Sequence, residues 1–287
     1  MYEIVWQYDE TSPQNEEKPG DAPGARQRLL DGNLEFASFF APHAAAGETT
    51  RQVVRVSPQD VGISGRPGDV PIQRPFAAFL SCADARVPVE LIFGQKANDL
   101  FVVRVAGNVI GDDSLGSLDY AVDQLGTVRL LAVLGHTGCG AVTAAVDAYL
   151  TPAGYLGIAT NFPLQTIVSS LIAPVRGAAL ALAAVYGPDV EARPGYRQAL
   201  IEMTVMLNAA LSAAVLAHNY SESLGDRLQV SFGVYDLRQR TVGLPGASGA
   251  WQVGLFAPPT TQEAFDEFGT VIAGSDLVRE ALGGEAT

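Results

Sequence analysis

The chain has 287 residues, of which 48% are hydrophobic, and it carries 31 acidic against 18 basic side chains. This length and composition allow one large domain with a substantial buried core and exclude general disorder. The net charge of −13 would repel nucleic acid and anionic membrane surfaces. We therefore expect neither a nucleic acid nor a membrane as a partner.

Both the start of the chain and its apolar runs bear on where the protein resides. Residues 1–23 are polar and acidic without hydrophobic periodicity, which predicts a flexible tail or an arm that becomes ordered only on a partner. They lack the charged start and apolar stretch of a signal peptide, so we expect a cytoplasmic protein. The longest apolar runs, 177–187 and 209–217, are shorter than the roughly 20 residues that cross a bilayer. These runs predict buried helices.

After the tail, the chain shows one helical pattern and one long connection. Residues 24–40 have apolar side chains at helical spacing, which predicts an extended N-terminal helical arm. Residues 45–73 are rich in glycine and proline, and we expect most of this segment to lack regular structure.

Apolar runs then alternate with helical patterns. Strands buried on both faces are predicted at 76–81, 100–105, 130–135 and 228–235, and helices at 115–125, 163–185 and 194–218. This order predicts a single α/β domain over residues 24–245, with a mainly parallel central sheet flanked by helices. Residues 246–287 are irregular apart from a weakly amphipathic stretch at 262–282, and they predict a C-terminal extension with either a peripheral helix or an oligomer contact.

Metal-binding side chains follow two of the predicted strands. Cys82 comes after 76–81, and His136 and Cys139 come after 130–135. The carboxyl ends of strands meet in a doubly wound sheet, so we expect the three side chains to converge. Two thiolates and one imidazole leave the fourth tetrahedral position of a catalytic zinc for water. Alternatives are that the two cysteines are inert core residues or form a redox disulfide.

Two charged residues stand in the loop that follows the first cysteine. Asp84 and Arg86 lie two and four residues after Cys82, so one loop can present a carboxylate and a guanidinium that binds it through two hydrogen bonds. A zinc ion lowers the pKa of its water to about 7. Asp84 is placed to accept a hydrogen bond from the resulting hydroxide and to orient it.

These motifs closely resemble the zinc site of the β-carbonic anhydrases. The sequence Cys82-Ala-Asp-Ala-Arg86 is followed by His136-x-x-Cys139, as in that family's pattern of Cys-x-Asp-x-Arg and His-x-x-Cys. The similarity extends over roughly residues 24–245 and includes these blocks: Asp99–Arg104, Ala106–Asn108, Ser117–Val122 and the strand near Val230–Tyr235.

The resemblance implies a function and a set of site residues. Zn²⁺ would be held by Cys82, His136 and Cys139, with Asp84 and Arg86 as the catalytic pair. Gln73, Phe101 and Tyr120 match positions that bind substrate or line the pocket, partly from the neighbouring subunit. The implied protein is a homodimer or a higher even oligomer. Its implied reaction is the reversible hydration of carbon dioxide to bicarbonate by zinc-bound hydroxide.

Some residues depart from the family pattern and leave alternatives open. Ala83 and Ala85 replace serines that are common beside the aspartate. Phe79 stands where the bicarbonate-regulated, closed-site subgroup has tryptophan, which favours an open site with water on zinc over one with Asp84 on the metal. Relatives with the same ligands hydrolyse carbon disulfide or carbonyl sulfide, and a non-catalytic scaffold with the same fold is a further alternative.

Overall fold

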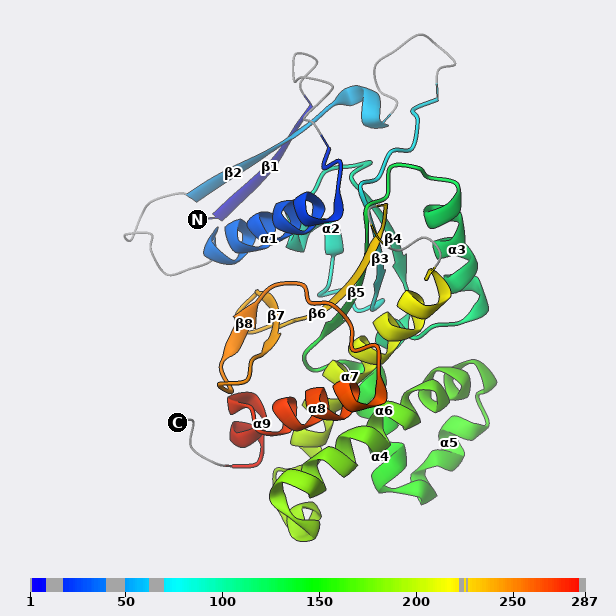
Figure 1. Cartoon of the computed structure of the whole chain (residues 1–287), viewed down its shortest axis with the longest axis vertical. Helices are drawn as coiled ribbons and strands as arrows, with labels where there is room; N and C mark the ends of the chain where they lie inside the picture. Colours follow the sequence, from blue (N-terminus) through cyan, green and yellow to red (C-terminus); the bar gives the residue numbers. More distant parts are fainter. Residues whose placement is uncertain are drawn as a thin grey trace.

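A six-stranded sheet lies at the centre of the computed structural model, which describes residues 2–8, 18–39, 50–61, 70–221, 225 and 227–283 (Figure 1). Its strand order is β4-β3-β5-β6-β7-β8. The strands are β3 (Ala77–Ser81), β4 (Leu100–Arg104), β5 (Leu130–His136), β6 (Gln229–Tyr235), β7 (Val242–Pro245) and β8 (Trp251–Val253). The first four run parallel and the last two antiparallel, which confirms the mainly parallel sheet.

The register of the parallel strands brings their carboxyl ends level. Ser81, the last residue of β3, lies beside Arg104 of β4 and Leu134 of β5. Both β3 and β5 are buried along their whole length, as continuous apolar runs in a covered parallel sheet should be. Cys82 therefore leaves β3 close to the place where His136 ends β5.

Alternate residues of the central strands divide the core into two layers. On one face, Ala132 and Leu134 pack with α1 (Ala22–Phe39) and α2 (Val89–Ile92). On the other, Leu131 and Val133 pack with helices that follow the strands. These helices are α3 (Asp112–Asp123), α4 (Gly140–Leu150), α6 (Phe162–Tyr186) and α7 (Tyr196–Asn219), with the short α5 (Leu156–Ala159) between α4 and α6.

The two longest helices confirm the predicted helices at 163–185 and 194–218 and differ in burial. Both α6 and α7 are long and apolar enough to meet the length and hydropathy of a membrane span. The most apolar window of α7 is 83% buried, as expected of a core helix, but that of α6 is only 39% buried. Leu180 on α6 is 70% exposed. The expectation that both apolar runs are buried therefore holds for α7 and for one face of α6.

The N-terminal expectations are partly wrong. Instead of a flexible tail, β1 (Tyr2–Tyr8) pairs in parallel with β2 (Thr50–Val56), which lies in the segment expected to be irregular. Strand pairing between segments more than 40 positions apart leaves no local sequence pattern, which explains the error. The two strands lie over α1, at the opposite end of the molecule from α5 (Figure 1). Residues 9–17, 40–49 and 62–69 of these predicted segments lie outside the described residues.

The C-terminal segment 246–287 packs onto the domain. The helices α8 (Gln262–Ala273) and α9 (Asp276–Ala281) lie in the stretch 262–282, where a peripheral helix was one of the two expectations. They pack against α6 and α7, and β8 extends the central sheet. Ile272 and Val278 are fully buried in the larger core layer, so this segment contributes to the core of the domain.

Candidate metal centre

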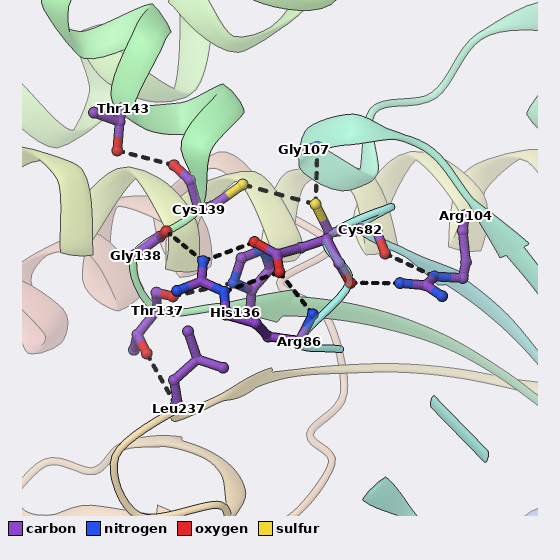
Figure 2. Close-up of polar contacts among 11 residues, drawn as sticks. Cys82, Arg86, Arg104, Gly107, His136, Thr137, Gly138, Cys139, Thr143 and Leu237 are labelled. Atoms are coloured by element: carbon purple, nitrogen blue, oxygen red, sulfur yellow. Dashed lines mark hydrogen bonds and ion pairs between the residues drawn. The ribbon is translucent and has the colours of Figure 1, made fainter. Parts of the chain in front are cut away.

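The three expected metal ligands converge at the carboxyl ends of β3 and β5. Cys82 directly follows β3, His136 is the last residue of β5, and Cys139 caps the start of α4. Their ligand atoms all lie within 4.8 Å of one another, and all three residues are buried. The two sulfur atoms face each other at 3.9 Å (Figure 2).

One nitrogen of the histidine ring is engaged by the backbone and the other faces the cluster. Nδ1 lies 3.0 Å from the carbonyl oxygen of Thr137, which can only accept a hydrogen bond, so Nδ1 is the donor in this contact. In a neutral imidazole with this tautomer, Nε2 offers its lone pair to a metal ion. Nε2 is buried and has no hydrogen-bond partner among the residues that the structure describes. A buried nitrogen without a partner costs stability unless something binds it, and a metal ion fits this position.

The two thiols form an asymmetric pair. Both cysteines are free, and the Cys82 sulfur accepts a hydrogen bond from the backbone N–H of Gly107 at 3.3 Å. The hydrogen bond from Cys139 lowers the pKa of Cys82, and the same bond with burial raises the pKa of Cys139. A metal ion binds thiolates, so it would displace the proton that the two sulfurs share. Two sulfurs and one imidazole are a donor set that suits zinc.

Asp84 and Arg86 form a doubly hydrogen-bonded pair beside the ligands. Arg86 Nε and Nη2 donate to the two carboxylate oxygens of Asp84 at 3.0 and 2.7 Å. Nη2 also approaches the carbonyl oxygen of Gly138 at 3.3 Å, which ties the pair to the turn that carries Cys139. Asp84 Oδ2 lies 3.7 Å from His136 Nε2. The hydrogen bonds from Arg86 hold the pKa of Asp84 well below its usual range, so the carboxylate is charged.

Two further residues shape the loops around Cys82. Arg104, at the end of β4, donates through Nε to the carbonyl oxygen of Cys82 at 3.0 Å. Asn208 on α7 donates to the carbonyl oxygen of Gly107 at 2.8 Å and so holds the N–H that reaches the Cys82 sulfur. Gly107 has φ +67°, and a side chain there would crowd Ala141. Sequence reasoning missed Asn208, although a buried amide inside an apolar helix is a usable signal.

A buried carboxyl group on α7 was also missed. Glu202 is 3% exposed, and its Oε1 accepts a hydrogen bond from Gln198 at 2.7 Å. Its Oε2 has no partner in the described part of the chain. Burial raises the pKa of Glu202, and the nearby positive charge of Arg238 partly offsets that rise. The residue lines a cavity of about 380 Å³ together with Arg238 and Glu280.

The three expected substrate-binding residues lie apart from this cluster within one chain. Gln73 is exposed and precedes the amino end of β3, whereas Cys82 follows its carboxyl end. Phe101 lies beside Ala78, four residues before Cys82, which is roughly 13 Å along a strand. Tyr120 on α3 is 48% exposed, and its ring lies 6.4 Å from that of Phe101. A single chain therefore brings together the ligands, Asp84 and Arg86, but not these three.

Comparison with known proteins finds relatives of the segment that carries this cluster. Residues 77–171, which contain the three ligands, match the family model described as carbonic anhydrase. A carbonic anhydrase of Mycolicibacterium smegmatis is 46% identical over 142 residues, which cover 48% of this chain and 61% of that protein. Carbonic anhydrase 2 of Mycobacterium tuberculosis is 47% identical over 97 residues, or 33% of this chain and 46% of that protein.

A third relative carries the name of a class. Beta-carbonic anhydrase 1 of Mycobacterium bovis is 38% identical over 81 residues, which cover 28% of this chain and 49% of that protein. Over these segments the chain is similar to the β-carbonic anhydrases. It spans about half the length of the curated relatives it matches. The segment that matches the carbonic anhydrase model includes Phe101 and Tyr120 but begins after Gln73.

Proposed function

We propose that this protein is a zinc-dependent carbonic anhydrase that hydrates carbon dioxide reversibly to bicarbonate and a proton. One observation carries the proposal: three buried metal-ligand atoms within 4.8 Å of one another have a charged carboxylate beside them, 3.7 Å from His136 Nε2. Cys82, His136 and Cys139 would hold the metal. The similarity of residues 77–171 to the carbonic anhydrase family supports the choice of substrate.

The donor set supports zinc with an open coordination position. Three protein ligands leave the fourth tetrahedral position of zinc free, as in other catalytic zinc sites. A bound zinc ion would lower the pKa of a water molecule, so that this water loses a proton near neutral pH. The carboxylate of Asp84 has both oxygens hydrogen-bonded to Arg86. That engagement supports the open site over one in which Asp84 binds the metal.

Asp84 orients the nucleophile in this proposal. A charged carboxylate only accepts hydrogen bonds, so its Oδ2 would fix the direction of an O–H group next to His136 Nε2. The lone pair of that oxygen then points away from Asp84, toward the substrate. The hydrogen bonds from Arg86 keep the Asp84 carboxylate charged. The contact of Arg86 with the carbonyl oxygen of Gly138 also anchors this carboxylate to the turn that carries Cys139. Orientation of this kind contributes to rate because the reacting atoms are positioned before the reaction.

Residues from a second subunit would complete the pocket. Gln73 and Tyr120 are exposed at the amino end of the parallel strands, away from the ligands of their own chain. A homodimer that places this end against the partner's metal centre would bring Gln73, Phe101 and Tyr120 to the substrate. This arrangement gives the three residues a role that one chain alone does not give them. The reduced thiols are consistent with our expectation of a cytoplasmic protein.

The test is stopped-flow hydration of carbon dioxide between about pH 6.5 and 9, with zinc content assayed in the same sample. We expect turnover that rises with pH and disappears when a chelator removes the metal. Full zinc occupancy without hydration would overturn the proposal. Release of hydrogen sulfide from carbon disulfide or carbonyl sulfide by that same sample would then identify the alternative substrates.

A further inference from the structure

The strands β1 and β2 form a small sheet with two open edges. Among the described residues each pairs only with the other, outside the central sheet (Figure 1). Their contacts are mainly with each other, and a cleft of about 840 Å³ lies between β2 and α1. One hydrogen bond across this cleft joins Gln52 to Glu35 at 2.9 Å. Among the residues that the structure describes, the small sheet therefore has few contacts beyond its own two strands.

A sheet of this kind is incomplete on physical grounds. An isolated pair of strands is at best marginally stable in water, and a parallel pair is slightly weaker than an antiparallel one. Three or more strands with an apolar face are needed for stability. Here Trp6 is 44% and Tyr8 54% exposed, on a strand whose outer edge pairs with no other strand in the described part of the chain. These features indicate a missing third strand.

The two edges differ in charge, and this difference favours the edge of β1 for pairing with a second copy in the register centred on the middle of the strand. Arg51 and Arg55 lie on one face of β2 with Val53 between them. Two β2 strands paired antiparallel about Val53 would place Arg51 opposite Arg55, and like charges directly opposite each other are destabilising. The described side chains of β1 include one charged group, Glu3, which already pairs with Arg51 at 3.3 Å.

We propose that β1 pairs antiparallel with β1 of a second copy of this chain, about a two-fold axis at Val5. In this register Ile4 lies opposite Trp6, Val5 opposite Val5, and Glu3 opposite Gln7, so no like charges meet. The result is a four-stranded sheet in the order β2-β1-β1-β2, with the apolar Ile4 and Trp6 side chains of both copies on one face. Such a contact is self-complementary, as a two-fold interface must be. It does not rest on the proposed function, and it is separate from the contact that would complete the pocket.

The test uses opposite charges at the two-fold axis. In full-length protein, Val5→Lys and Val5→Glu each place two like charges opposite each other, and we expect each variant to show half the wild-type mass by sedimentation velocity. An equimolar mixture of the two variants places lysine opposite glutamate. We expect the mixture to recover the wild-type mass, which a variant that had merely lost its fold could not do. The matched control is Val53→Lys, the register partner of Val5 on β2, which should leave the mass unchanged.

Three outcomes would overturn the proposal. If both Val5 variants keep the wild-type mass, β1 does not join two copies. If their masses fall but the mixture does not recover, the charges have disrupted β1 itself and not a contact between two β1 strands. If Val53→Lys lowers the mass as much as Val5→Lys, the β2 edge is the contact instead.

Discussion

The two ends of β3 differ in how much of the site one chain supplies. At the carboxyl end, Cys82 meets His136 and Cys139 in a buried cluster whose hydrogen bonds all come from the same chain. At the amino end, Gln73 is exposed, and Phe101 and Tyr120 contact each other away from that cluster. One chain therefore assembles the candidate metal site by itself, whereas the proposed substrate contacts would need a second chain.

Removal of a metal ligand should have the largest effect on activity, because the candidate metal site at the carboxyl end of β3 would lose one of its three ligands. We expect His136→Ala to lower the zinc content from about one ion per chain to nearly none, and to abolish hydration. The measurement is metal analysis after dialysis, together with stopped-flow activity. His218→Ala is the matched control, since His218 is exposed near the end of α7 and should keep both zinc and activity. Full zinc content in His136→Ala would remove this residue from the ligand set.

Asp84→Asn should separate metal binding from turnover at the same end. We expect zinc content to remain while hydration falls on the order of 100-fold or more, because an amide no longer only accepts hydrogen bonds. Since Arg86 holds the pKa of Asp84 below its usual range, the wild type should lose no activity through Asp84 protonation above about pH 5.

The control for this prediction is a second aspartate with the same geometry. Asp147 accepts two hydrogen bonds from Arg197 at 2.7 and 2.8 Å on the protein surface, away from the ligands. Asp147→Asn should leave turnover unchanged. If Asp84→Asn and Asp147→Asn lose the same fraction of turnover, the pair of Asp84 with Arg86 contributes to folding and not to the reaction.

Substitution at the amino end should have a smaller effect that depends on assembly. We expect Tyr120→Ala to keep its zinc and to lower kcat/KM roughly tenfold, as the loss of one apolar contact does. Dilution of the wild type below the dissociation constant of its oligomer should lower the activity per chain without loss of zinc. If fully dissociated chains keep wild-type kcat/KM, the pocket is complete in one chain and the contrast between the two ends is wrong.

Glu202→Gln should have the smallest effect, on stability at neutral pH. Below the unfolded-state pKa of about 4.3, Glu202 is protonated in both the folded and the unfolded chain, so its ionisation does not lower the free energy of unfolding. Because burial raises its folded pKa, the unfolded chain releases the proton first as pH rises, and stability is lost until the folded pKa is passed. The variant has no such loss. We expect its Tm to match wild type near pH 4 and to exceed it by roughly 2–4 °C at pH 8.

The exposed Glu267→Gln on α8 is the control for this titration and should change Tm little at any pH. If the Tm of Glu202→Gln differs from that of the wild type by the same amount from pH 4 to 8, packing and not the buried charge explains the difference.

The sequence predicts the features of the fold and the site that have a local pattern, and it misses those that depend on contacts between distant segments. The parallel strands and long helices were predictable because periodicity is local, and the ligand set was predictable because carboxyl ends of parallel strands meet. The pairing of β1 with β2, and the support that Asn208 gives to Gly107, join segments far apart in the chain. Such contacts leave no local pattern. The positions of Gln73, Phe101 and Tyr120 relative to the ligands depended on strand register, which local spacing does not define.

X-ray absorption at the zinc edge tests the central claim most directly, because it reports the ligands of the metal in the purified protein. The account predicts two sulfur ligands at about 2.3 Å and two nitrogen or oxygen ligands at about 2.0–2.1 Å, one of them from solvent. Asp84→Asn should leave this spectrum unchanged. A site without two sulfur ligands, or a first shell that loses an oxygen ligand in Asp84→Asn, would contradict the account.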